Sequence, residues 1–253
     1  MTLRSDIAFS TPDKITVRGK DLANDILGKM NLGDFAYFQL TGKTASPEQS
    51  RMFNAVLITL VEHGMTPSAI AARMTYAGAP ESLQAAVAAG LCGLGTVFVG
   101  TTEGSARMLY EAFEGAGEKP DLDALAKKTV ADYRARKQII PGIGHPIHKP
   151  IDPRTPRLFQ IAEDNGMSGK YVALMTRIGA EAERASGKVL PINATGALGS
   201  ICCEFGFPWK IVRGFGVMAR AIGLVGHILE ESQQPMALEI WHDVEARASA
   251  HQR

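Results

Sequence analysis

The spacing of the apolar residues constrains this chain most strongly, because they recur every three or four positions along most of its length. Residues 48–63 show the pattern best, with one apolar stripe made of Met52, Phe53, Val56, Leu57, Leu60 and Val61. This spacing places the stripe on one face of an amphipathic helix. Strand-like alternation is nearly absent, apart from a short stretch at residues 15–17. The sequence therefore predicts an all-α fold, preceded by a short irregular N-terminal arm over residues 1 to about 20.

Further helices are expected between clear turn signals. Pro67 suits the first position of a helix that follows Thr66. The run rich in Ala, Leu and Gly at residues 81–114 predicts two buried helices, joined near residues 93–95 at the centre of the core. Later helices are expected after the turn at 115–123 as far as about 138, at 157–164, at 168–186, beyond Thr195 and at 215–231. We interpret residues 1–253 as a single unit, in which residues from about 115 to 190 could form a small mobile subdomain.

Composition and charge exclude several classes of function. The 253 residues are 45% hydrophobic and 21% charged, with a net charge of +1, and basic residues do not cluster as in a nucleic-acid-binding surface. No uninterrupted apolar run reaches about 18 residues, so no membrane span is expected. The first residues lack the apolar core of a secretory signal. Three cysteines, two of them adjacent, are typical of reduced thiols in a cytoplasmic protein.

Residues 141–154 are the most informative segment, and they read Pro-Gly-Ile-Gly-His-Pro-Ile-His-Lys-Pro-Ile-Asp-Pro-Arg. The glycines allow a ligand to approach the backbone, and the prolines stiffen the loop. A stiff loop that carries two histidines, a lysine, an aspartate and an arginine is a candidate binding site, although a solvated surface connection is the alternative. His145 and His148 could bind a metal ion, but no third ligand is apparent, so no metal is predicted.

Arg220 lies in an otherwise apolar helical segment and shares one face with Gly223 and His227. A solvated face would carry more charge, so this face favours a lined pocket or a subunit interface. An arginine suits a carboxylate through its planar fork of donors, although a structural ion pair is the alternative. The opposite face is apolar and consists of Met218, Ile222, Val225 and Leu229.

The order of several short motifs resembles the citrate synthase and citryl-CoA lyase family over residues from about 30 to 232. Residues 57–64, which end in Glu-His-Gly, look like the family segment that ends in "DHG". Residues 142–145 read "GIGH" and residues 152–154 read "DPR", as in the family. Residues 223–227 are similar to the "GFIGH" helix in the lyase module of ATP-citrate lyase. The resemblance implies a citrate-synthase-like helical domain with a small helical subdomain.

The resemblance also implies roles for individual residues. It places imidazoles against the hydroxyl, carbonyl and carboxylate oxygens of the substrate, guanidinium groups on its carboxylates, and a basic loop beside coenzyme A. The residues concerned are His63, His145 and Thr195 in catalysis; Arg154, Arg220 and Asn193 in substrate binding; and Gly142, Gly144 and Lys149 in coenzyme A binding.

Three positions depart from the family pattern. Val99 stands where citrate synthases carry the histidine that polarises the acetyl thioester, and Pro146 follows "GIGH" where the lyase branch usually has an arginine. Thr195 replaces the catalytic aspartate that moves the proton at the acetyl carbon. A threonine hydroxyl is not a general base near neutral pH without activation.

From the resemblance we expect a citryl-CoA lyase-like enzyme. It would cleave a carboxylated 3-hydroxyacyl-CoA to acetyl-CoA and a keto acid such as oxaloacetate, with His145 or His63 as the general base. Thr195, or a water that it orients, would replace the missing proton donor. The alternatives are a coenzyme A thioester enzyme of altered substrate or reaction, and a non-catalytic ligand-binding subunit. A homodimer or larger homo-oligomer is expected, with no metal, nucleic acid or membrane partner.

Overall fold

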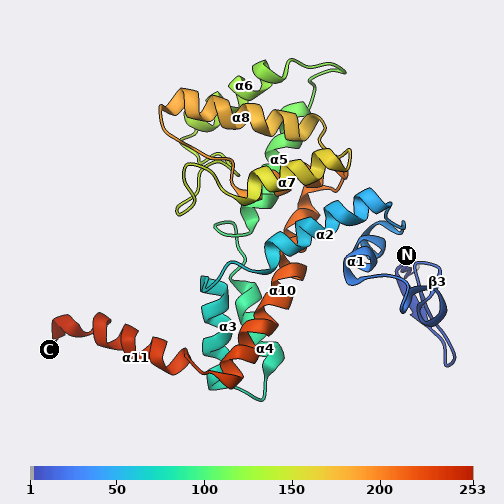
Figure 1. Cartoon of the computed structure of the whole chain (residues 1–253), viewed down its shortest axis with the longest axis vertical. Coiled ribbons are helices and arrows are strands. Elements are labelled where there is room, and N and C mark those ends of the chain that lie inside the picture. The colour runs from blue at the N-terminus through green and yellow to red at the C-terminus, as the bar shows by residue number, and fades with distance from the viewer. Residues whose placement is uncertain (1–2, 253) are drawn as a thin grey trace.

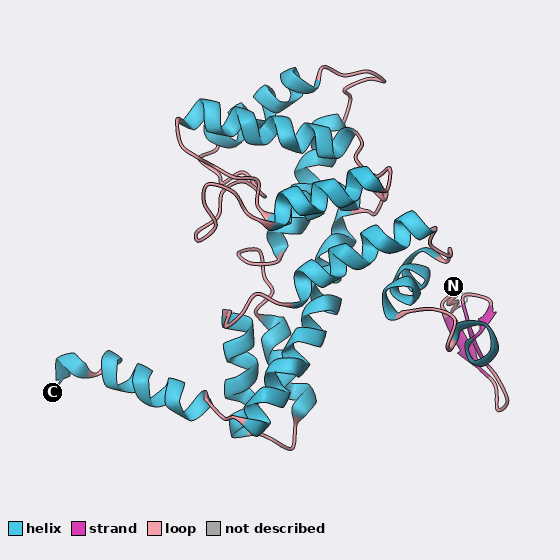
Figure 2. Ribbon diagram, viewed as in Figure 1, coloured by secondary structure: helices cyan, strands magenta, loops and turns pink. Residues whose placement is uncertain are grey.

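The predicted helices are present in the computed structural model, which describes residues 3–252 (Figures 1 and 2). Among these residues, three short strands precede a chain of helices. The helices are α1 (Leu32–Thr41), α2 (Pro47–Val61), α3 (Pro67–Gly78), α4 (Leu83–Cys92), α5 (Gly100–Phe113), α6 (Leu122–Ala135), α7 (Arg154–Asp164), α8 (Lys170–Ser186), α9 (Ala194–Glu204), α10 (Trp209–Gln233) and α11 (Ala237–Ala248). The all-α prediction is confirmed.

The N-terminal segment is more regular than the irregular arm that the sequence predicted. Strands β1 (Ala8–Ser10), β2 (Ile15–Val17) and β3 (Lys20–Asp21) form a small antiparallel sheet in that order. The expected strand at 15–17 is its central member, but its neighbours are too short to show alternation in the sequence. The part of the predicted arm formed by residues 1–2 lies outside the described residues.

The main hydrophobic core surrounds α9. Nearly every residue of α9 is buried, and its glycines let other segments approach closely. A Cβ atom at Gly199 would lie 2.7 Å from the Cβ atom of Ser105 on α5. Because α9 is packed so tightly, its N-terminal turn is a rigid place for a functional group.

The prediction that both helices of residues 81–114 lie at the centre of the core is correct only for α5. In α4, only Ala86 and Gly90 are buried, and this helix joins a smaller cluster with α3 and the second half of α10. Small residues there serve close helix contact, since a Cβ atom at Gly90 would lie 2.8 Å from the carbonyl oxygen of Ser68. They contribute little apolar area to a core.

Helix α10 is longer than predicted, and α11 was not predicted at all. By length and mean hydropathy, which reaches 1.4 in its most apolar window, α10 is the one described helix that could span a membrane. In this fold it packs against α2, α3, α4 and α5, as the core helix of a globular domain does. Helix α11 projects away from the body of the molecule (Figure 1).

Residues 115–190 correspond largely to α6, the following loop, α7 and α8. Helices α6 and α8 pack against each other at the end of the molecule opposite α11 (Figure 1). Their buried side chains, such as Val130 and Ile178, belong to the same hydrophobic cluster as α2 and α9. The mobility of this segment as a subdomain stays a prediction.

Candidate active site

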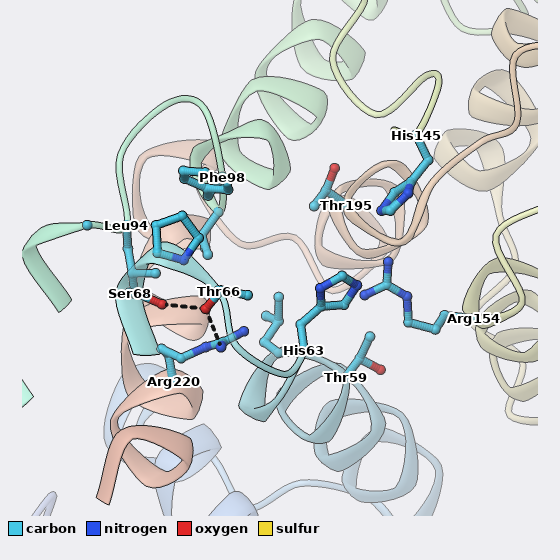
Figure 3. Close-up of a pocket in the computed structure, with 14 residues that line it drawn as sticks. Thr59, His63, Thr66, Ser68, Leu94, Phe98, His145, Arg154, Thr195 and Arg220 are labelled. Carbon is cyan, nitrogen blue, oxygen red and sulfur yellow. Dashed lines mark hydrogen bonds between the residues drawn. The ribbon is translucent and has the colours of Figure 1, made fainter. Parts of the chain in front are cut away.

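Four side chains from distant parts of the sequence line one cavity of about 150 Å³ (Figure 3). His63 comes from the turn after α2, His145 from the loop before α7, Arg154 from the first turn of α7, and Arg220 from the middle of α10. Thr195, in the first turn of α9, also lines the cavity, with the hydroxyl side chains of Thr59, Thr66 and Ser68. The fold therefore brings together the two imidazoles and the two guanidinium groups that the sequence singled out.

The loop that carries His145 is fastened to the segment before α9. The Gly142 carbonyl oxygen accepts the Asn193 backbone N–H at 3.0 Å, and the Gly144 N–H donates to the Pro191 carbonyl oxygen at 2.7 Å. Gly142 has φ +83°, and a Cβ atom there would lie 2.4 Å from the Cα atom of Gly196. Only glycine satisfies both conditions. This contact sets the distance between His145 and the N-terminus of α9.

His145 is held in one tautomer. Its Nδ1 atom accepts hydrogen bonds from the backbone N–H groups of Ile147 at 3.1 Å and His148 at 2.9 Å. Nδ1 must keep its lone pair for these bonds, so the proton of the neutral ring is on Nε2. Burial, followed by the charge of His148, lowers the pKa of His145 and favours the neutral ring. His145 is thus a hydrogen-bond donor at Nε2.

His63 lies beyond the end of α2, not inside a helix that continues to residue 63 as predicted. The helix stops at Val61 because the Glu62 carboxylate accepts the backbone N–H groups of His63 and Gly64, both at 2.7 Å. Partial burial and then the charge of Arg154 lower the pKa of His63, although part of the side chain is open to solvent. A neutral His63 can accept a proton.

Arg154 is bound to a buried aspartate two residues earlier. Its Nε and Nη2 atoms donate to the two carboxylate oxygens of Asp152 at 3.0 and 2.9 Å. Asp152 is fully buried and also accepts the backbone N–H of Ala194 at 2.8 Å. Burial opposes its ionisation, but the hydrogen bonds from Arg154 and Ala194 lower the pKa of Asp152 to about 2. This pair fixes Arg154 beside the start of α9.

Arg220 has no close ionic partner, although its side chain is only 7% exposed. Its Nε atom is buried and makes no hydrogen bond. Its Nη1 atom is 3.5 Å from the Thr66 hydroxyl (Figure 3) and 4.0 Å from the nearest oxygen of Glu62. Burial is the main reason that the pKa of Arg220 is lowered. An arginine left in this state is suited to an anion that enters the cavity.

Asn193 and Thr195 form the start of α9. The Asn193 side-chain oxygen accepts the backbone N–H groups of Thr195 and Gly196 and so caps the helix. It also accepts the Thr195 hydroxyl at 2.6 Å, while the Asn193 amide donates to the Gly144 carbonyl oxygen at 2.6 Å. The Thr195 hydroxyl therefore uses its proton in the hydrogen bond to Asn193, and its oxygen is available only as a hydrogen-bond acceptor. The contacts of Asn193 make it a positioning residue; direct substrate binding by its side chain stays a prediction.

A second, larger cavity of about 600 Å³ adjoins the first and shares with it His63, His145, Arg154 and Thr195. Most of its lining is apolar and comes from residues 139–147 and from Val97 and Phe98. Gly142 and Gly144 lie on its wall. Lys149 is exposed and lines neither cavity, so its predicted contact with coenzyme A stays a prediction.

The third histidine of the cluster is His148, which the sequence analysis raised only as a metal ligand. One ring nitrogen from each of His63, His145 and His148 falls within 4.8 Å of the others, as metal ligands could. The rings of His145 and His148 are stacked, with centroids 4.4 Å apart. In His145, however, Nδ1 is occupied by two backbone N–H groups and Nε2 carries the proton, so neither nitrogen is free for a metal ion.

Other charged residues with a positioning role were not singled out as site residues from the sequence. Asp152 holds Arg154, and Glu62 holds the backbone at His63. His227 Nε2 lies 3.1 Å from Glu62 and its Nδ1 accepts from Arg73, which is fully buried. The sequence offered one signal for Asp152, Glu62 and His227, because each lies within a motif or helix face that also carries a predicted site residue; Arg73 had no such signal.

An all-helical protein with this cavity falls in a recognisable structural class. The family described as citrate synthase, C-terminal domain, matches residues 13–240. The solved citryl-CoA lyase of Hydrogenobacter thermophilus is 32% identical, covers 91% of this chain and 87% of its own, and superposes with a TM-score of 0.82. The chain therefore belongs to the citrate synthase family, as the motifs had suggested.

Two further relatives extend the comparison. A citrate synthase of Deinococcus radiodurans is 26% identical over 219 residues, which are 85% of this chain and 56% of that protein. The ATP citrate lyase of Methanothrix soehngenii, solved with citrate and coenzyme A, shares the fold with a TM-score of 0.77, at 22% identity over 92% of this chain and 39% of its own. The chain thus spans about half the length or less of the first curated relatives that it matches.

Proposed function

We propose that this protein is an acyl-CoA carbon–carbon lyase of the citryl-CoA lyase type. The observation that carries the proposal is the buried Arg220, whose Nε makes no hydrogen bond and which faces a cavity shared with His63 and His145. An uncompensated guanidinium is costly to bury unless an anion completes the site. The adjoining apolar cavity could receive the thioester arm of coenzyme A.

The reaction proposed is the cleavage of a 3-hydroxyacyl-CoA that carries a carboxylate on its hydroxyl-bearing carbon. His63 removes the hydroxyl proton, because its pKa is lowered and it is neutral near pH 7. His145 cannot be that base while Nδ1 accepts two backbone N–H groups, so its Nε2–H donates to the oxygen as it becomes a carbonyl. The general base is thus His63, one of the two candidates from the sequence.

As the carbon–carbon bond breaks, its electron pair moves to the carbon next to the thioester and forms an enolate. That carbon takes up a proton, and the products are acetyl-CoA and a keto acid. The hydroxyl proton taken by His63 can return through a water bound to the Thr195 oxygen, which is free to accept. Atoms and charges balance without another reactant. Arg220 and the free side of Arg154 hold the carboxylate of the keto acid.

The test is the release of keto acid from citryl-CoA and related thioesters, followed with an NADH-dependent dehydrogenase. His63→Gln should lower kcat by about two to four orders of magnitude, as expected for loss of a general base. A matched control is His242→Gln on α11, far from the cavity, which should leave kcat unchanged. If the wild-type protein binds citrate and coenzyme A but releases no keto acid, the non-catalytic alternative replaces this proposal.

Thr195→Asp distinguishes a site whose rate is limited by the missing aspartate from a site in which Thr195 has its own role. If the absence of an aspartate limits the rate, the substitution should raise kcat. If Thr195 has its own part in proton transfer, the substitution should abolish the native activity. Measuring kcat and KM separately shows whether chemistry or binding has changed.

We also propose that the protein works in the cytoplasm as a homo-oligomer. The face of α10 that contains Ile222, Val225 and Leu229 is exposed, whereas the sequence favoured a lined pocket or a subunit interface at the opposite face. The Arg220 face instead turns inward, with Gly223 against the backbone of Val61. An exposed apolar stripe favours association, and light scattering on the purified protein would show its mass.

A further inference from the structure

The charges around the small cavity limit how many carboxylates it can hold. Among residues 3–252, Arg154 and Arg220 are the two cationic side chains that line it. Arg154 already binds both oxygens of Asp152, and this buried carboxylate is ionised above about pH 2. Arg154 and Asp152 together therefore add no net charge to the cavity.

A second carboxylate offsets the charge of Arg220 in part. Burial opposes the ionisation of Glu62, but the backbone N–H of His63 and the contact with His227 lower its pKa overall. Glu62 is therefore ionised near pH 7, 4.0 Å from Arg220. His63 and His145 also line the cavity, and their lowered pKa values favour the neutral rings; His148 is stacked on His145, and His227 contacts Glu62. The two arginines and their two neighbouring carboxylates, Asp152 and Glu62, thus carry no net charge together.

A first carboxylate still has a place, because the Nε atom of Arg220 is buried and makes no hydrogen bond. A second carboxylate would need another cation. Pro146 offers no side-chain donor, and α10 and α11 contain no lysine or arginine between Arg220 and Arg247. Apart from the uncharged hydroxyl side chains of Thr59, Thr66, Ser68 and Thr195, the rest of the cavity wall is apolar and includes Leu60, Leu94, Phe98 and Val99. This wall suits a hydrogen atom or an alkyl group and not an anion.

We propose that the substrate carries one carboxylate and a small apolar group on its hydroxyl-bearing carbon, so that the keto acid released is a 2-oxo monocarboxylate of the pyruvate class. The inference rests on the proposed function and narrows its substrate. A keto acid with two carboxylates, such as oxaloacetate, places its second charge in a cavity where residues 3–252 provide no cationic side chain besides Arg154 and Arg220.

Two thioesters that differ at one substituent test the inference. They are 3-carboxy-3-hydroxybutanoyl-CoA, with a methyl group, and citryl-CoA, with a carboxymethyl group at the same carbon. We expect kcat/KM to be at least about tenfold higher for the methyl compound, the scale at which one substituent is discriminated in a pocket. A Pro146→Arg variant, altered on an exposed loop, should reduce that preference by raising kcat/KM for citryl-CoA.

The outcomes separate this inference from the proposed function. Faster cleavage of citryl-CoA overturns the inference and keeps the lyase. If neither thioester is cleaved, the proposed lyase activity is overturned. Calorimetric titration with pyruvate and oxaloacetate in the presence of coenzyme A then decides whether the cavity prefers a single carboxylate. Tighter binding of pyruvate keeps the one-carboxylate cavity. Equal or tighter binding of oxaloacetate, or no binding of either acid, overturns it.

Discussion

Replacing Arg220 with methionine should weaken ligand binding without weakening the fold. In the bound state the guanidinium would form a buried pair with the carboxylate, and losing one member of such a pair costs about 3–5 kcal/mol. Because about 1.4 kcal/mol corresponds to a tenfold change in affinity, the dissociation constant should rise by roughly two to three and a half orders of magnitude. In the free protein, Arg220 is buried with an unpartnered Nε, so a methionine of similar length should leave the melting temperature unchanged or higher.

Arg73 provides the matched control, because it is also buried but is fully paired. Its Nη1 donates to Glu231 at 3.0 Å, its Nη2 contacts Glu230, and its guanidinium donates to His227. Arg73→Met leaves the buried Glu231 without its cationic partner and should cost about 3–5 kcal/mol. At about 2–4 °C per kcal/mol for a chain of this length, the melting temperature should fall by roughly 6–20 °C.

The assay combines calorimetric titration of the keto acid with thermal unfolding of the wild-type protein and both variants. The reasoning is refuted if Arg220→Met lowers the melting temperature by several degrees and leaves the dissociation constant unchanged. That result would make Arg220 a structural partner of Glu62, the alternative that its sequence context left open.

The remaining predictions concern the loop before α7 and the pH profile. Gly142→Ala should abolish activity and lower the melting temperature, because the new Cβ atom would lie 2.4 Å from the Gly196 Cα atom; Gly144→Ala, with the same sign of φ but 3.8 Å of clearance, should be milder in both measurements. The acid limb of kcat/KM should fall below pH 6.5, the ordinary pKa of histidine, because His63 has a lowered pKa and must be neutral to act as a base. Stability should also decline as pH falls through about 6.5, since the unfolded chain then binds protons at His63 and His145 that the native protein does not. A limb above pH 7 would contradict the assigned base.

Helix positions were predictable where apolar spacing and capping residues agreed. Helix α3 begins at Pro67 with Thr66 as its N-cap, as its sequence indicated. Helix α11 also carried a signal, since Leu238, Trp241 and Val244 recur every third residue, but all three are exposed and the segment lies against little else. The residue spacing on α10 predicted an apolar face and a face that carries Arg220, but it did not indicate which of the two is buried. An apolar stripe suits both a core and an intermolecular contact.

Site residues were predictable from short motifs, but the tautomer of His145 and the charge available at Arg154 were not. The convergence of His63, His145, Arg154 and Arg220 followed from the order of the motifs. The tautomer of His145 depends on where two backbone N–H groups point, and the charge available at Arg154 depends on the burial of Asp152. Such facts depend on three-dimensional contacts that residue spacing does not specify.

Two buried arginines that belong to or contact α10 have different roles. Arg73, on α3, pairs with residues of α10 and stabilises the fold, whereas Arg220, on α10, faces the cavity. In the second half of α10, Glu231 accepts Arg73 and also the backbone N–H of Ala237, which starts α11. One turn earlier on α10, His227 contacts both Arg73 and Glu62. Glu62 in turn accepts the backbone N–H of His63. These paired charges therefore hold the backbone at His63, the proposed general base, and compensate one another within the protein. Arg220 lies two turns before His227 on the same helix and has only long contacts, with Glu62 at 4.0 Å and Thr66 at 3.5 Å, so its buried Nε is left to hydrogen-bond a ligand.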